Sequence, residues 1–230
     1  MTEPEFDGYA HTYQEMVREP IRDRFARNPQ FFDERKWILL RDFFKARQRS
    51  TGSMSWLDVG AGQGNLLRMG RSSFGRVAGC DTSPAMLEGA RDLEVRLQSP
   101  PERLPFGDQE FDLATAVCVF HHVEPVDRPA LVQEMKRVLR PGGIICLIEH
   151  NAQNFVVRGM VKRIPLDVNA VLLKHRECHA LFRGAGLRSL HTEFFLYLPE
   201  LLYRHLAPLE ALGKRVPFGG QYAAFAERPA

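Results

Sequence analysis

The feature that most constrains this chain is a glycine-rich segment, Leu57-Asp-Val-Gly-Ala-Gly-Gln-Gly-Asn65. The apolar run over 54–59 predicts a buried strand before it, and Leu66–Met69 predicts the start of a helix after it. Alternating glycines let the backbone approach a ligand closely, and the N–H groups at the start of a helix are free to bind one. The segment therefore predicts a ligand site where the first strand of the fold ends.

The spacing of the glycines excludes two common nucleotide motifs. The dinucleotide pattern G-x-G-x-x-G requires a glycine at position 65, where Asn65 stands, and no Gly-Lys-Ser/Thr follows to form a phosphate loop. Asp58, two residues before the first glycine, would repel a pyrophosphate and favour a cationic ligand. A nicotinamide-dependent oxidoreductase is therefore only a distant alternative.

A second strand, predicted over 74–80, ends at Asp81, and Ser83-Pro84 then gives a helix start with Ser as the cap. A carboxylate at this point of a parallel sheet can accept hydrogen bonds from the two hydroxyls of a ribose. A cap or turn role for Asp81 is the alternative. Its position just after the glycine segment favours the ribose.

Strands that alternate with helices continue along the chain, which indicates a parallel sheet with helices on both faces. Further strands are expected over 95–98, 111–120, 144–149, 187–198 and 221–226, and further helices over 128–139 and 177–184. Residues 1–50 read as helical, broken at Pro20 and Pro29. The stretches 151–175 and 199–220 are long enough to be functional loops that wall a substrate site.

Composition narrows the class of protein. A chain of 230 residues with 44% hydrophobic residues fits one large domain or two small ones, and no apolar run reaches 18 residues. The acidic, polar N-terminus does not resemble a secretory signal, and a formal charge of +3 does not mark a nucleic-acid binder. Four dispersed cysteines, Cys80, Cys118, Cys146 and Cys178, suggest reduced thiols in a cytoplasmic protein. No cluster of Cys and His predicts a metal site.

An ordered series of motifs resembles class I S-adenosylmethionine (SAM)-dependent methyltransferases, and most closely the branch that methylates small molecules, quinones and lipids. The matching segments, all within 54–149, are Leu57–Gly64, Gly79–Leu87, Leu104–Phe106, Phe111–Ala114, His121–Val123 and Arg137–Gly143. The resemblance implies an α/β, Rossmann-like, doubly wound sheet of seven mostly parallel strands in the order 3-2-1-4-5-7-6, with only the last strand antiparallel. It favours a single domain over 1–230, with a helical N-terminal lid (1–50), a SAM-binding core (54–150) and two substrate-side insertions (151–175 and 199–220).

The resemblance also implies which residues hold the cofactor. Gly60, Gly62 and Gly64, with Ala61 between them, would pass beneath the methionine part. Asp58 would meet its amino group, and Asp81 the ribose. The remaining expected cofactor-binding residues are Thr82 and Met86 beside the adenine, Cys118 and Val119 near the sulfonium, and Tyr13, in the Phe6–Tyr13 segment that would fold over the cofactor. Family members often carry an acid where Pro100 stands, so the adenine contacts here are expected from Gln98, Ser99 or backbone groups.

Methyl transfer needs an acceptor held in line with the methyl–sulfur bond and often a base. His121, His122 and Glu149, at the ends of the fourth and fifth expected strands, are the candidate catalytic residues, although each could be structural. We expect a small-molecule acceptor methylated on oxygen, nitrogen or carbon, S-adenosylhomocysteine as product and no nucleic-acid partner. A non-catalytic SAM-binding partner subunit and an RNA or protein methyltransferase are the alternatives. The sequence does not reveal the oligomeric state.

Overall fold

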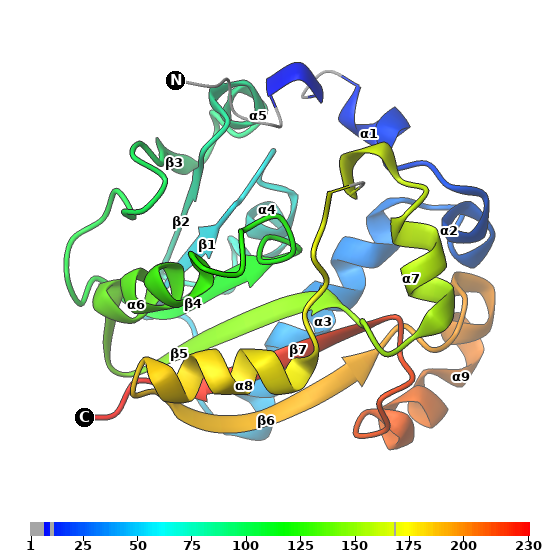
Figure 1. The fold of residues 1–230 in the computed structure, drawn as a ribbon. Coiled ribbons are helices and arrows are strands. Elements are labelled where there is room, and N and C mark those ends of the chain that lie inside the picture. The colour runs from blue at the N-terminus through cyan, green and yellow to red at the C-terminus, as the bar shows by residue number, and fades with distance from the viewer. Residues whose placement is uncertain (1–6, 10–11, 168) are drawn as a thin grey trace.

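The computed structural model describes residues 7–9, 12–167 and 169–230 (Figure 1). A single seven-stranded sheet runs through it in the order β3-β2-β1-β4-β5-β7-β6. The strands are β1 (Ser55–Val59), β2 (Arg76–Asp81), β3 (Glu94–Leu97), β4 (Phe111–Val117), β5 (Leu139–His150), β6 (Arg188–Phe195) and β7 (Gln221–Glu227). The order matches the one expected from sequence.

Helices precede, connect and follow the strands. They are η1 (Asp7–Tyr9), α1 (Tyr13–Met16), α2 (Pro20–Phe25), α3 (Gln30–Ala46), α4 (Asn65–Gly70), α5 (Pro84–Glu88), α6 (Arg128–Val138), α7 (Phe155–Val161), η2 (Pro165–Asp167), α8 (His175–Gly184) and α9 (Glu200–Gly213).

Strand direction places the site. Strands β1 to β5 pair in parallel, and β7 lies antiparallel between β5 and β6, so β6 runs the same way as the parallel strands. Val59 pairs with Cys80 on one side and Ala116 on the other, so three strands end at the same edge. Ligands of open parallel sheets bind at this carboxyl edge.

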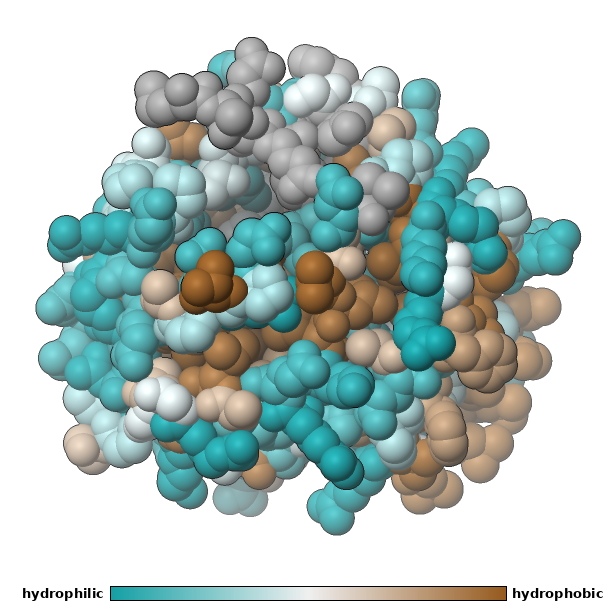
Figure 2. All heavy atoms as spheres, viewed as in Figure 1, coloured by the Kyte–Doolittle hydropathy of each residue, from teal (hydrophilic) through white to brown (hydrophobic). Residues whose placement is uncertain are grey.

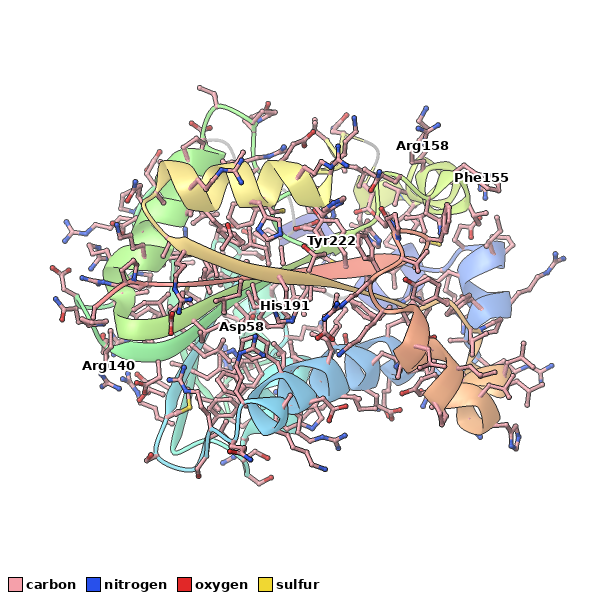
Figure 3. The ribbon with its side chains drawn as sticks, turned by 90° about the horizontal axis from the view of Figure 1, so that it is seen from below. Asp58, Arg140, Phe155, Arg158, His191 and Tyr222 are labelled. Carbon is pink, nitrogen blue, oxygen red and sulfur yellow. The ribbon has the colours of Figure 1, made fainter. Side chains whose placement is uncertain are left out.

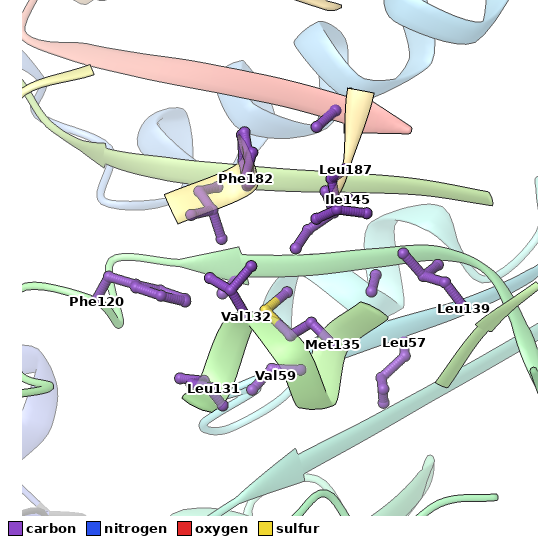
Figure 4. Packing of buried hydrophobic residues seen from close by; sticks show 14 of the residues in the cluster. Leu57, Val59, Phe120, Leu131, Val132, Met135, Leu139, Ile145, Phe182 and Leu187 are labelled. Atoms are coloured by element: carbon purple, nitrogen blue, oxygen red, sulfur yellow. The ribbon is translucent and has the colours of Figure 1, made fainter. Parts of the chain in front are cut away.

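Two apolar layers cover the two faces of the sheet. Helices α3 and α4 pack on one face, where Phe43, Phe44 and Leu67 join the fully buried Trp56. Helices α6 and α8 pack on the other, where Val132, Met135 and Phe182 meet strand residues such as Leu57 and Ile145 (Figure 4). Figure 3 shows the strands between α3 on one side and α8 on the other. Apolar burial on both faces explains why the central strands read as continuous hydrophobic runs.

Three expected strand boundaries were wrong. The strand expected over 111–120 ends at Val117 because Cys118 has a φ of 56°. The strand expected over 187–198 ends at Phe195 because Leu196 has a φ of 61°. Positive φ turns the chain out of the extended conformation. The strand expected from 144 begins at Leu139, directly where α6 ends.

The two long insertions contain helices: α7 and η2 lie within 151–175, and α9 fills most of 199–220. Pro208 bends α9, leaving Leu206 outside helical geometry. A buried ion pair between Arg35 of α3 and Glu210 of α9 joins this helix to the body of the molecule. The outer side of α9 exposes large apolar residues, seen at the lower right of Figure 2; they include Leu201, Leu202, Leu209 and Leu212.

The expected N-terminal lid divides into two parts. Helix α3 is a core layer, since Phe31, Leu40, Phe43 and Phe44 are buried in it. The segment 17–33 instead lines the large cavity described below. Among the described residues, no helix has the length and apolarity needed to cross a membrane. All four cysteines are free; three are buried and Cys118 is half-buried.

Candidate cofactor and acceptor site

One large cavity, about 2140 Å³ in volume, opens at the carboxyl edge of the sheet. A typical small-molecule site holds about 300–1,000 Å³. The cavity therefore has room for more than one small molecule. Its walls come from the glycine segment, the ends of β2, β4 and β5, and both insertions.

The glycine segment needs glycine for its shape. Gly60, Gly62 and Gly64 all have positive φ, at 70°, 53° and 76°. A Cβ on Gly60 would overlap Val119, and a Cβ on Gly64 would lie 2.6 Å from Leu93 Cδ1. The N–H groups of Gly60 and Ala61 donate to the carbonyl of Cys80, at 2.8 and 2.9 Å. These bonds tie the loop to the end of β2.

Asp81, at the end of β2, lies against this loop. Its Oδ2 accepts from the N–H of Gly62 at 2.9 Å, and its Oδ1 accepts from the N–H of Ser83 at 2.9 Å. Burial raises the pKa of Asp81, although these N–H groups oppose the shift. Each carboxylate oxygen keeps a further lone pair for a ligand hydroxyl. The Ser83 hydroxyl donates to a carboxylate oxygen of Asp7 in η1. The first described residues therefore lie beside Asp81 and the glycine segment.

Asp58 lies at the end of β1 and is 3% exposed. Its Oδ1 accepts from the Thr115 hydroxyl at 2.5 Å, and Thr115 in turn accepts from the Trp56 indole N–H at 2.8 Å. Burial raises the pKa of Asp58 to about 7, against the opposing effects of Thr115 and of Lys36 on α3. A carboxylate in this state is stabilised by an added positive charge.

The other expected cofactor residues line the same cavity: Thr82, Met86, Ser99, Cys118 and Val119. Gln98 lines it too, but its side-chain amide already donates to the carbonyl of Pro101 at 2.5 Å. Burial raises the pKa of Cys118 to about 12, so the thiol stays protonated. The side chain of Tyr13 and residues 6, 10 and 11 lie outside what the structure describes.

The three expected catalytic residues meet, but in unequal positions. Glu149 is fully buried behind His121, with its Oε2 2.5 Å from His121 Nδ1. The other oxygen of Glu149 accepts from the N–H groups of Val119 and Phe120 at 3.0 and 2.7 Å. His121 and His122 line the cavity, and Glu149 is not among the lining residues described. Glu149 therefore positions His121.

Two residues that the sequence analysis did not select complete the cluster. Asp167 of η2 lies 3.5 Å from His121 Nε2 and 3.3 Å from His122 Nε2. His150, at the end of β5, has its ring centroid 5.2 Å from that of His121. Both line the cavity. The polar run Glu149-His150-Asn151 at a strand end was a usable signal for His150, whereas nothing around Asp167 in the sequence singles it out.

The charges in this cluster balance one another. Burial alone would lower the pKa of His121, but Glu149 and Asp167 outweigh it and raise that pKa to about 9. Burial would raise the pKa values of both carboxyls, but the histidines hold them below their usual range. Burial, together with the charge on His121, lowers the pKa of His150 to about 4. At neutral pH the His121 imidazolium thus lies between the carboxylates of Glu149 and Asp167, beside a neutral His150.

Asn151 and Asn154 join the two insertions at the rim. The Asn151 amide donates to the carbonyls of Pro217 and Gly219, at 3.0 and 2.8 Å. Asn154 caps α7 with its oxygen and donates to the carbonyl of Phe218 at 2.8 Å. These amides are used within the protein, so their function is to hold the wall of the cavity.

The match to known proteins falls on this same region. Residues 57–147 match the family model described as a methyltransferase domain. They form a class I, SAM-dependent methyltransferase domain. The glycine segment, Asp81 and the end of β4 all lie within the matched residues.

Relatives of the methyltransferase domain agree in family and fold. A demethylmenaquinone methyltransferase from Tropheryma whipplei is 33% identical over 56% of this chain and 59% of its own length. A chain from the complex between the Haloferax volcanii Trm112 methyltransferase activator and a methyltransferase superposes with a TM-score of 0.68 at 21% identity, covering 100% of both chains. A SAM-dependent methyltransferase from Thermotoga maritima also gives a TM-score of 0.68, at 16% identity, over 97% of this chain and 98% of its own. The chain spans about half the length of the first curated relatives it matches.

Proposed function

We propose that this protein transfers a methyl group from SAM to an oxygen, nitrogen or carbon atom of a small-molecule acceptor, releasing S-adenosylhomocysteine. The observation that carries the proposal is that one cavity joins the glycine segment and Asp81 to the histidine cluster. A cofactor on the first and an acceptor against the second would share one cavity, as an in-line displacement requires.

The cofactor's position in this proposal follows the geometry of the cleft. Asp81 accepts the ribose hydroxyls, the glycine segment passes beneath the methionine part, and Asp58 faces the amino group. Thr82, Met86 and Ser99 flank the adenine, and Cys118 and Val119 lie near the sulfonium. The positive sulfonium and ammonium suit a cleft that carries two buried carboxyls, those of Asp58 and Asp81.

The acceptor side is apolar around a polar end. Its walls include Ile21, Phe25, Met160, Ile164 and Phe218, and its polar end consists of His121, His122, His150 and Asp167. This lining favours a molecule with an apolar body and one nucleophilic group. His121, held by Glu149, would contact that group, and His122 would flank it.

The charge of the lining argues against an RNA acceptor. Among the described lining residues, three are Arg or Lys and seven are Asp or Glu. A site for a polyanion needs cations that neutralise phosphates. The lining therefore favours a small acceptor over a nucleic acid.

The direct test is release of S-adenosylhomocysteine when the protein is incubated with SAM and a library of acceptors. We expect turnover with acceptors that have an apolar body and a hydroxyl, amine or activated carbon. In Asp81→Ala, SAM affinity should fall at least tenfold, because two ribose hydrogen bonds to a charged group are lost. A protein that binds SAM but turns over no acceptor would instead be the non-catalytic subunit.

Asp58 should make SAM affinity depend on pH. Since its pKa in the free protein is about 7, it is largely protonated below pH 7 and must ionise to meet the cofactor's ammonium. We expect SAM affinity, measured by calorimetry, to rise up to about tenfold per pH unit from pH 5.5 and to level off above pH 7. The same raised pKa stabilises the cofactor-free protein at low pH, and this contribution is lost as the pH rises through 7.

Asp58→Asn is the matched control for this pH dependence. Lys36, Asp33 and Asp81 also influence the charge at Asp58, and all three remain in this variant. The variant should bind SAM more weakly, with a flatter profile between pH 5.5 and 7. An equally steep profile in the variant would assign the pH dependence to another group.

A further inference from the structure

Three side chains from separate parts of the chain meet at the polar end of the acceptor cavity. His121 follows β4, His150 ends β5, and Asp167 ends η2. One potential ligand atom from each lies within 4.8 Å of the other two. Two imidazoles and one carboxylate form a ligand set that first-row transition metals use in proteins.

His121 is already oriented as a metal ligand would be. Its Nδ1 lies 2.5 Å from one carboxylate oxygen of Glu149. The other oxygen of Glu149 accepts hydrogen bonds from the N–H groups of Val119 and Phe120. The other nitrogen, Nε2, therefore points toward Asp167. Metal-binding histidines commonly give one ring nitrogen to a carboxylate behind them, which fixes the ring and raises its basicity.

The spacing at Asp167 is wider than a charge-assisted hydrogen bond would give. Charge-assisted N–H···O bonds measure about 2.7–2.9 Å, whereas His121 Nε2 lies 3.5 Å from Asp167 Oδ1. Two ligands that each lie about 2.1 Å from a tetrahedral zinc ion are about 3.4 Å apart. The separation thus suits an ion held between the nitrogen and the oxygen.

We propose that His121, His150 and Asp167 bind one divalent first-row transition-metal ion, such as zinc. The imidazole ligands disfavour magnesium and calcium, which prefer oxygen. A metal ion at this point takes the place of the proton on His121 Nε2. Three protein ligands leave a position open toward the cavity, where a bound ion would polarise an acceptor oxygen in place of the direct contact with His121.

Metal binding is tested on the full chain without SAM or acceptor, so its outcome is separate from that of the proposed methyl transfer. The protein is stripped with a chelator and titrated with Zn²⁺ in competition with a chromogenic chelator, and with Co²⁺ followed by visible absorption. We expect one ion per chain. His150→Ala and Asp167→Asn should each weaken binding by about 100-fold or more, and Glu149→Gln by about 10–100-fold, as for a residue that positions a ligand.

His205→Ala is the control, because His205 is exposed on α9, far along the chain from the cluster. Its zinc affinity should equal that of the unaltered protein. Far-ultraviolet circular dichroism and SAM affinity report whether each variant is folded. Unchanged zinc binding in a folded His150→Ala protein, or equal loss in His205→Ala, would overturn the proposal.

X-ray absorption on the unaltered zinc-loaded protein requires no variant. We expect two imidazole nitrogens and at least one oxygen around the ion. No stoichiometric zinc at micromolar protein concentration, or a sulfur ligand from the half-buried Cys118, would refute the site.

Discussion

Gly60→Ala is expected to weaken SAM binding by about 100-fold, equivalent to about 2.7 kcal/mol. Gly60 has a φ of 70°, where an alanine costs about 1–2 kcal/mol. The new Cβ would also overlap the Val119 side chain, and overpacking of this kind costs about 1–3 kcal/mol. Both strains are relieved only if the glycine segment moves away from β4. Calorimetric titration with SAM measures the loss.

Gly142→Ala is a matched control, because Gly142 has a similar φ of 75° but no atom within 4 Å of an added Cβ. It lies near the start of β5 and does not line the cavity. This variant should show only the cost of backbone strain in its stability, with unchanged SAM affinity. Adding Val119→Ala to Gly60→Ala should restore part of the binding. Near-normal SAM affinity in Gly60→Ala would mean that the loop does not contact the cofactor.

Glu149→Ala is expected to lower the free energy of unfolding by about 3–5 kcal/mol, because it removes one partner of a buried ion pair. The fully buried carboxylate serves three donors: His121 Nδ1 and the N–H groups of Val119 and Phe120. Alanine would leave the two N–H groups without their carboxylate acceptor, and that of Phe120 is buried. Urea unfolding at pH 7, followed by circular dichroism, measures the change.

Two further variants serve as comparisons for Glu149→Ala. Glu149→Gln keeps an oxygen for the two N–H groups and should cost less than alanine. Glu94→Ala removes a carboxylate that pairs with Arg76 at 2.6 Å on the partly exposed edge strand β3, so it should cost less than about 1 kcal/mol. A loss in Glu149→Ala as small as that in Glu94→Ala would contradict the network described here.

The residues expected to hold the cofactor could be chosen from the sequence because their determinants are local. The glycine segment and Asp81 each follow directly from a strand, and parallel strands bring their carboxyl ends to one edge. The strand order also matched, since the motif series implies the fold. Glycine spacing, strand ends and helix caps are short-range features, and the sequence displays them in order.

The polar end of the cavity could not be predicted in the same way, because its residues come from distant segments. His121 and His150 end different strands, while Asp167 arrives from the insertion after β5. They are separated by 29 and 17 residues, so the sequence shows no local pattern of metal ligands and predicts no metal site. The sequence makes Glu149 a candidate catalytic residue, and only the fold shows that its side chain is buried behind His121.

The side chain of Asn151 bonds the carbonyls of Pro217 and Gly219, and that of Asn154 bonds Phe218. Two segments more than 60 residues apart thus form one wall of the large cavity. In protein engineering, these two segments should therefore be exchanged together. A graft that brings in a relative's segment 151–167 without its segment 214–220 would separate the amide donors from the carbonyls that they bind. If this cavity binds the acceptor as proposed, both segments together would determine which acceptor fits.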